Sequence, residues 1–173
     1  MSVFIVFAGL PGVGKTTIAR ELSRRLSAVY LHVDSLEFAL SESGVSLEEL
    51  GPGGYHAAAA IAIDNLANGM RVIADSVNPW PITRELWRNA AKKANARFVG
   101  IEIRCTDEKE HRRRVESRIA DIEGFVLPTW RDVVKRDYAS WNDADIIIDT
   151  AGESAPQSVE RIICLLEERE ANQ

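Results

Sequence analysis

The stretch Gly9–Thr17, with the sequence GLPGVGKTT, matches the pattern G-x-x-x-x-G-K-[ST] in full and follows the apolar run Val3–Ala8. Glycines at this spacing let successive backbone N–H groups curl around phosphate oxygens, where an ordinary side chain would block close approach. Lys15 can then reach the β- and γ-phosphates of a nucleotide, and the Thr16 hydroxyl can bind Mg²⁺. The sequence therefore predicts a phosphate-binding loop between a strand and a helix. The alternative is a glycine-rich turn that binds nothing.

The length and composition of the chain indicate one packed domain, which we expect to span residues 1–173. A formal net charge of −5 argues against a general nucleic-acid or anionic-membrane binder, although a local basic patch stays open. No segment approaches the roughly 20 apolar residues of a membrane span. The N-terminal apolar run lacks the basic start of a signal peptide. We expect a cytoplasmic protein with no membrane partner, whose two distant cysteines are reduced.

Apolar runs that alternate with helical periodicity predict five strands and the helices between them. The strands are expected at residues 3–8, 29–33, 71–75, 98–104 and 144–149. The first helix is expected to begin near residue 15, and further helices should cover residues 36–40, 46–50, 55–68, 81–94, 106–118, 128–138 and 155–169. Such alternation is typical of an α/β fold built on a parallel sheet with right-handed crossovers.

Two carboxylates follow expected strands. Asp34 comes after the second strand and Asp75 ends the third. Ligands of open α/β sheets gather at the carboxyl ends of the strands, so both residues are site candidates by position. Asp34 could instead N-cap the short helix that follows it, which is a common use of aspartate, and the two roles can coexist. Asp75 could instead cap its own loop.

The densest basic cluster lies in the segment His111–Arg118. Arg114 and Arg118 stand four residues apart and should share one face of a helix. Arg112 and Arg113 should lie on other faces, and we assign them to the solvated surface. The cluster as a whole could also be ordinary surface charge or a patch for a nucleic-acid backbone.

A phosphate-binding loop alone does not separate kinases, GTPases, motor ATPases and passive nucleotide binders. A GTPase needs a guanine-selecting Asn-Lys-x-Asp, and the nearest stretch here, Asn142–Asp145, has no lysine. The third strand ends in Asp75–Asn78, with the sequence DSVN, which lacks the Asp-x-x-Gly of the γ-phosphate switch. GTP is therefore not the expected nucleotide.

The remaining pattern resembles the small phosphate-loop kinases of the nucleoside-monophosphate-kinase-like group. This group contains adenylylsulfate kinase, chloramphenicol phosphotransferase, gluconate and shikimate kinases, polynucleotide 5′-kinase and the zeta toxins. The resemblance rests on the loop, on Asp34, on Asp75 and on the arginine-bearing helix, in that order along nearly the whole chain. It implies a three-layer α/β/α sandwich with a five-stranded parallel sheet and a helical lid at about residues 106–128.

The resemblance also implies ATP and Mg²⁺ as cofactors and a role for each matching residue. Asp34 would align the attacking hydroxyl, and Thr16 and Asp75 would bind Mg²⁺. Arg114 and Arg118 would close over the transferring phosphoryl group, and Lys15 would neutralise its charge. The nucleotide would contact Gly9, Gly12, Val13, Gly14, Lys15, Thr16 and Thr17.

The phosphate acceptor is expected to be a small molecule that reacts through a hydroxyl group. Its candidate contacts are Asp34, Tyr55, His56, Asn78 and Arg84. For His56 a surface or cap position is an open alternative. Two other functions also stay open: a polynucleotide 5′-hydroxyl kinase, which the acidic net charge disfavours, and a regulatory ATP-binding switch without catalysis.

Overall fold

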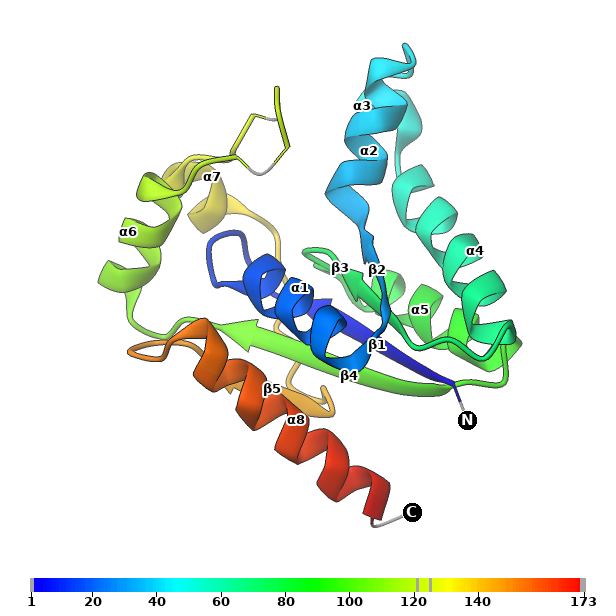
Figure 1. Cartoon of the computed structure of the whole chain (residues 1–173). Coiled ribbons are helices and arrows are strands. Elements are labelled where there is room, and N and C mark those ends of the chain that lie inside the picture. Colours follow the sequence, from blue (N-terminus) through cyan, green and yellow to red (C-terminus); the bar gives the residue numbers. More distant parts are fainter. Residues whose placement is uncertain (1, 121, 125, 172–173) are drawn as a thin grey trace.

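The computed structural model of the chain describes residues 2–120, 122–124 and 126–171 and is built around one parallel sheet (Figure 1). The five strands lie in the order β2-β3-β1-β4-β5, and every pairing is parallel. They are β1 (Val3–Ala8), β2 (Val29–His32), β3 (Val72–Asp75), β4 (Arg97–Arg104) and β5 (Ile146–Asp149). The predicted α/β fold with five parallel strands is confirmed.

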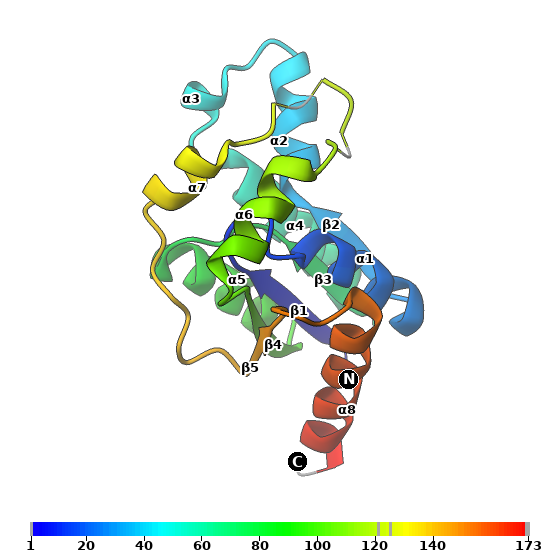
Figure 2. The ribbon, with the colours of Figure 1, turned by 90° about the vertical axis from the view of Figure 1, so that its left-hand side faces the viewer.

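Eight helices are assigned within the described residues: α1 (Lys15–Leu26), α2 (Val33–Glu42), α3 (Leu47–Leu50), α4 (Gly53–Ala67), α5 (Pro81–Lys93), α6 (Glu108–Ser117), α7 (Trp130–Lys135) and α8 (Ala155–Ala171). Helices α1 and α8 cover one face of the sheet, and α4 and α5 cover the other (Figure 1). Figure 2 shows α6 and α7 on the side turned toward the viewer, in front of α1 and the sheet. None of the described helices combines the length and apolar character needed to cross a bilayer.

The central strand β1 is buried along its whole length because helices cover both of its faces. Successive side chains of a strand point to opposite faces. Ile5 and Phe7 therefore join the core under α1 and α8, while Phe4 and Val6 join the core under α4 and α5. This double coverage fixes β1 rigidly, so the loop that follows it starts from a well-defined point.

The strand β2 ends one residue earlier than predicted, because Val33 already belongs to helix α2. That helix is longer than the predicted segment 36–40, and Asp34 lies in its first turn. The prediction that Asp34 could be the N-cap is wrong, since His32 occupies that position. A carboxylate in the first turn still interacts favourably with the helix dipole.

Helix α6 begins as predicted, with the Asp107 side chain accepting a hydrogen bond from the Glu110 backbone N–H at 3.0 Å. It ends at Ser117, and Arg118 is extended, with φ −72° and ψ 148°. The prediction that Arg114 and Arg118 share one helical face is therefore wrong, because the helix ends before Arg118. The expected lid at about 106–128 includes residues 121 and 125, which lie outside the described residues.

A buried carboxylate ties the segment before β5 to the sheet. Glu102 of β4 accepts hydrogen bonds from the Tyr138 hydroxyl at 2.8 Å and from the Trp141 backbone N–H at 2.7 Å. The six-membered ring of Trp141 lies directly against Gly100, where any Cβ would collide with it. This contact fixes the course of the chain between α7 and β5.

We expect Gly100→Ala to lower the free energy of unfolding by about 1–3 kcal/mol, because the added methyl group overpacks the site occupied by Trp141. Denaturant unfolding measures the change. The double variant Gly100→Ala/Trp141→Phe should lose less than the sum of the two single variants, because phenylalanine lacks the colliding atoms. Additive losses would show that the collision does not control stability here.

Candidate active site

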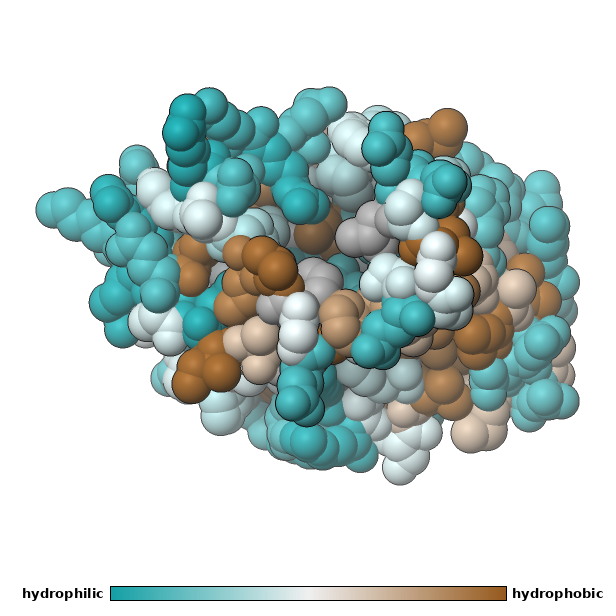
Figure 3. Space-filling view, turned by 90° about the horizontal axis from the view of Figure 1, so that it is seen from above, coloured by the Kyte–Doolittle hydropathy of each residue, from teal (hydrophilic) through white to brown (hydrophobic). Residues whose placement is uncertain are grey.

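A cavity of about 900 Å³ lies beside the phosphate-binding loop, near the carboxyl ends of β1, β2 and β3. Its lining includes most of that loop, the first turns of α2, the segment after β3, and residues of α6 and of the loops around α7 and β5. Figure 3 views the molecule from above, where these elements end, and shows brown apolar side chains gathered among teal charged ones. We call this space the active-site cavity.

The phosphate-binding loop adopts a backbone that its glycines make possible. Gly9 and Gly12 have φ values of 142° and 85°, which residues with a side chain rarely adopt. A Cβ at Gly9 would collide with the carbonyl oxygen of Ile103, and a Cβ at Gly12 would collide with the Val115 side chain of α6. The loop is therefore packed tightly between β4 and α6, and its remaining open side faces the cavity.

Lys15 is a buried cation with an exposed fraction of 7%. Its ammonium group donates a hydrogen bond to the Leu10 carbonyl at 3.0 Å. Burial lowers the pKa of Lys15, and the nearby carboxylates Asp75 and Asp34 oppose that shift. An anion bound in the loop would favour the charged form further, which is what a phosphate group supplies.

The two predicted carboxylates are linked through a histidine. Asp75, only 1% exposed, accepts a hydrogen bond from the Tyr30 hydroxyl at 2.7 Å. Nε2 of His32 lies 3.8 Å from an oxygen of Asp75 and 3.8 Å from an oxygen of Asp34. Nδ1 of His32 is held by the Ser35 hydroxyl at 2.8 Å. The His32 imidazole at the end of β2 thus lies between the two carboxylates.

Tyr30 and His32 were not predicted as site residues, although the sequence carries a signal for them. The two residues are two apart in a strand, so their side chains point to the same face. Their rings stack with centroids 6.0 Å apart. Burial and the neighbouring Asp75 raise the pKa of Tyr30 well above its usual value, so the hydroxyl stays protonated and remains a donor to Asp75.

Arg114 lies in α6, Arg118 follows the end of that helix, and both reach the cavity from the segment after β4. Arg114 donates to the Glu110 carboxylate at 2.6 Å and to the side-chain and backbone oxygens of Thr150, each at 2.8 Å. The Thr150 hydroxyl also donates to the Val13 carbonyl of the loop at 2.9 Å. Arg114 and Arg118 both line the cavity. Arg114 is therefore anchored to the phosphate-binding loop through Thr150.

Helix α6 rests directly on the phosphate-binding loop. Nε2 of His111 lies 2.8 Å from the Pro11 carbonyl oxygen. A carbonyl oxygen can only accept a hydrogen bond, so Nε2 of His111 carries the proton in this contact. Burial lowers the pKa of His111, and Lys15 and Arg114 lower it further. The Trp130 ring packs edge to face on His111 with centroids 5.1 Å apart, so α7 is joined to the same contact.

Some of the expected acceptor residues line the cavity, and others do not. Tyr55 lines the cavity, and its hydroxyl accepts a hydrogen bond from the Asn78 backbone N–H at 3.1 Å. His56 is exposed on α4 and is not among the lining residues. Asn78 and Arg84 are buried behind the cavity wall. Arg84 donates to the carbonyls of Asn78, Ala139 and Ser140, so it holds two chain segments together and does not face the cavity.

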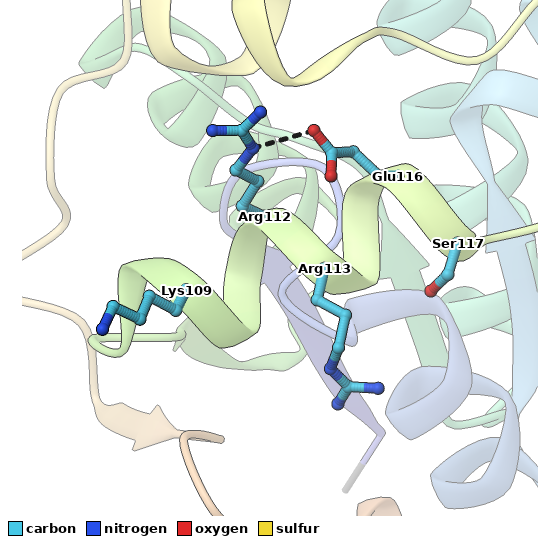
Figure 4. Close-up of a pocket in the computed structure, with 5 residues that line it drawn as sticks. All are labelled: Lys109, Arg112, Arg113, Glu116 and Ser117. Atoms are coloured by element: carbon cyan, nitrogen blue, oxygen red, sulfur yellow. Dashed lines mark hydrogen bonds and ion pairs between the residues drawn. The ribbon is translucent and has the colours of Figure 1, made fainter.

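A separate depression lies on the outer side of α6 (Figure 4). Its lining residues are Lys109, Arg112, Arg113, Glu116 and Ser117. Arg112 donates to Glu116 at 2.8 Å, and Figure 4 shows the Lys109 and Arg113 side chains extending away from each other. Arg112 and Arg113 are exposed, in agreement with the predicted solvated surface.

The cavity is also lined by charged residues that were not expected from the sequence, which are Arg20, Glu37, Arg136 and Glu153. Glu37 follows Asp34 by three residues on α2, so a helix start at Val33 would have revealed it. Burial and then the charge of Asp34 raise the pKa of Glu37 to about 7, while Arg136 opposes the shift. Arg136 follows the short helix α7, and sequence spacing carries no signal for it.

The raised pKa of Glu37 makes stability depend on pH. The folded state holds this proton more tightly than the unfolded chain, whose carboxyl has a pKa near 4.5. The stabilising contribution is therefore complete below that value and is lost as the pH rises through about 7. Glu37→Gln, which stays neutral, should melt above wild type at about pH 8, and the difference should largely disappear by about pH 5.

Thermal unfolding at both pH values checks this expectation. Glu42→Gln is the matched control, because Glu42 ends the same helix in an exposed position. A difference between Glu37→Gln and wild type that does not change with pH would contradict the burial of the Glu37 carboxyl.

Comparisons with known proteins agree with this arrangement. The sequence profile of the family described as AAA domain matches residues 4–133. No curated protein matched the chain in sequence. Several solved kinase structures share its fold at low identity. The Mycobacterium tuberculosis APS kinase in complex with AMPPNP and APS is 20% identical with a TM-score of 0.72, and the alignment covers 96% of this chain and 98% of that one.

Two further structures are those of a sugar kinase and a gluconokinase. A Janibacter sugar kinase is 17% identical with a TM-score of 0.70, covering 96% of this chain and 95% of its own. A Sinorhizobium meliloti gluconokinase is 15% identical with a TM-score of 0.65, covering 97% and 93%. The resemblance to small phosphate-loop kinases is thus confirmed for the fold. Because the family profile matches most of the sequence, the chain belongs to the AAA domain family.

Proposed function

We propose that the protein is a single-domain kinase, spanning residues 1–173, that transfers the γ-phosphate of ATP to a hydroxyl group of a small-molecule acceptor. The observation that carries this proposal is that one cavity is lined by the phosphate-binding loop, by Asp34 and Asp75, and by Arg114 and Arg118. Phosphoryl transfer needs positioning and charge neutralisation more than covalent chemistry, and this set of residues supplies both.

The residues at the loop suit ATP and Mg²⁺. The loop glycines leave space for phosphate oxygens, and the buried Lys15 ammonium is a ready partner for them. Thr16 and Asp75 would hold Mg²⁺, which would supply charge neutralisation for the phosphate groups. Within the described residues no group of three His, Cys, Asp or Glu side chains could hold a metal alone. This suits Mg²⁺, which usually keeps water and phosphate ligands.

Asp34 would orient the acceptor hydroxyl on the side of the cavity opposite to the lid. In the transfer, the acceptor oxygen forms a bond to the γ-phosphorus, and the bond from that phosphorus to the oxygen bridging to the β-phosphate breaks. The hydroxyl proton passes to Asp34, and ADP leaves. His32 and Tyr30 act as positioning residues, because they fix the Asp34 and Asp75 carboxylates.

The lid, at about residues 106–128, would exclude water from the γ-phosphate. Its helix α6 already rests on the loop through His111, and Thr150 and Glu110 orient the Arg114 guanidinium. Arg114 and Arg118 would then neutralise the transferring group. Arg136 faces the same region, since its charge acts on Lys15. We expect such an ATP-dependent reaction to take place in the cytoplasm.

We expect Lys15→Ala to abolish measurable ATP binding and phosphoryl transfer. Asp34→Asn should lower the transfer rate by at least about 100-fold while changing ATP affinity only a few-fold, because it removes the group that accepts the proton. The assay measures transfer from labelled ATP to sugars, nucleosides, adenylylsulfate, aminoglycosides and phenicols. Asp64→Asn, an exposed change on α4, is the matched control.

The same assay separates the competing functions. Strong, salt-dependent labelling of an oligonucleotide would favour a polynucleotide 5′-kinase instead. ATP binding without transfer to any acceptor, and with Asp34→Asn indistinguishable from wild type, would favour a regulatory switch.

A further inference from the structure

The acceptor end of the active-site cavity contains a second carboxylate besides Asp34. Glu37 follows Asp34 by three residues on α2, so both side chains lie on one face of the helix, and both line the cavity. Glu37 packs against Gly54 of α4, where a Cβ would come within 2.7 Å of its Oε1 atom. The absence of a side chain at Gly54 therefore makes room for the Glu37 carboxylate.

The charges around Glu37 come from three elements. Asp34 faces it from the same helix, Arg136 faces it from the end of α7, and the Tyr55 hydroxyl lies near it on α4. Within the described residues, Glu37 forms no hydrogen bond and no ion pair. Two neighbouring carboxylates repel each other, and that repulsion is relieved when a cation binds between them.

Arg136 does not remove the need for such a cation when nucleotide is bound. Its charge acts on Lys15 as well as on Glu37, and the charge of Arg118 also acts on Lys15, so Arg136 lies within range of both groups. Phosphate groups bound at the loop would attract both arginines. With nucleotide bound, we therefore expect Asp34 and Glu37 to lie beside the acceptor with less compensation from Arg136.

A buried hydroxyl supports a ligand at the acceptor end independently. Ser76 lines the same cavity and is 3% exposed, and its Oγ atom has no hydrogen bond of normal geometry within the described part of the chain, with the Tyr55 hydroxyl as a nearby polar group. A buried polar atom left without a partner costs free energy, so its presence in a cavity wall indicates a ligand group that completes it.

Aromatic rings surround this end of the cavity. Phe38, Tyr55 and Trp80 line it, and the Trp80 ring is fixed by a hydrogen bond from Nε1 to Asp137 at 3.0 Å. Trp80 is 45% exposed, so part of its ring is available to a ligand. Aromatic faces attract cations as well as apolar groups.

From these features we propose that the acceptor is a hydroxylated amine, with its ammonium group bound by the Glu37 carboxylate. The Ser76 hydroxyl is a second acceptor for its protons, and the hydroxyl group that is phosphorylated faces Asp34. The inference rests on the proposed kinase function and names its substrate class. A neutral polyol would place no cation beside the two carboxylates, and an anionic acceptor would add to their repulsion.

Matched compounds test the charge requirement. Glucosamine is compared with N-acetylglucosamine and glucose, 2-aminoethanol with 1,2-ethanediol, and gluconate serves as the anionic probe. Binding is measured by calorimetry with the full chain, Mg²⁺ and AMPPNP present. At least one amine should bind about tenfold or more tightly than its uncharged counterparts. The affinity for 2-aminoethanol, whose ammonium group stays charged over this range, should rise between about pH 6 and about pH 8 as Glu37 loses its proton.

Two variants assign the preference to the residues named. Glu37→Gln should reduce the preference for the amine to about threefold or less, while Glu42→Gln on the same helix should retain it. Ser76→Ala should weaken amine binding by a smaller factor, so the proposal remains testable through a second residue. Thermal unfolding confirms that each variant is folded.

The outcomes distinguish this inference from the proposed function. If neutral or anionic compounds bind and are phosphorylated as well as the amines, the amine subsite is wrong and the kinase function stands. If no amine of the panel binds, the inference is also overturned. If amines bind with the expected dependence on Glu37 but no compound is phosphorylated, the binding site stands and the kinase function fails.

Discussion

The Lys15 ammonium is a buried charge, and the arrangement of the cavity follows from the need to balance it. A cation in the protein interior is costly unless hydrogen bonds and opposite charges compensate it. The Leu10 carbonyl and the carboxylates Asp75 and Asp34 do so in part, while Arg118 and Arg136 act in the opposite direction. Bound phosphate oxygens would complete the compensation for all three cations at once. The site is thus electrostatically prepared for a polyanion before any ligand enters.

The loop that carries Lys15 is held by neighbours on both sides. Gly9 lies against the backbone of β4, and Gly12 lies against Val115 of α6, so neither position accepts a side chain. His111 and Thr150 add hydrogen bonds from α6 and from the segment after β5. Because helix α6, which carries Arg114, rests on the phosphate-binding loop, a change in the conformation of that loop would alter the position of Arg114 directly. This contact gives a physical route by which nucleotide binding and lid position can be coupled.

Side chains of both charges line one cavity, and the proposed functions make use of both. Lys15, Arg114, Arg118 and Arg136 are the cations that the proposal assigns to the phosphate groups, and Asp34 and Glu37 are the carboxylates that it assigns to the acceptor. The raised pKa of Glu37 reflects burial and the neighbouring charge of Asp34, which is unfavourable unless a ligand makes use of it. Nε2 of His32 lies between the Asp34 and Asp75 carboxylates, 3.8 Å from an oxygen of each.

The sequence by itself determined the phosphate-binding loop, because the spacing of its glycines is a local signal of backbone geometry. It also determined the five strands, and with them the positions of Asp34 and Asp75 at strand ends, because apolar periodicity is a local signal too. It misjudged element ends such as Val33 and Arg118, where tertiary contacts and the local backbone compete. Only the tertiary structure decided the strand order, the bond between Tyr30 and Asp75, the placement of Arg136 and the inward position of Arg84. These depend on contacts between residues far apart in the chain, such as Arg84 with Ala139, which no local pattern encodes.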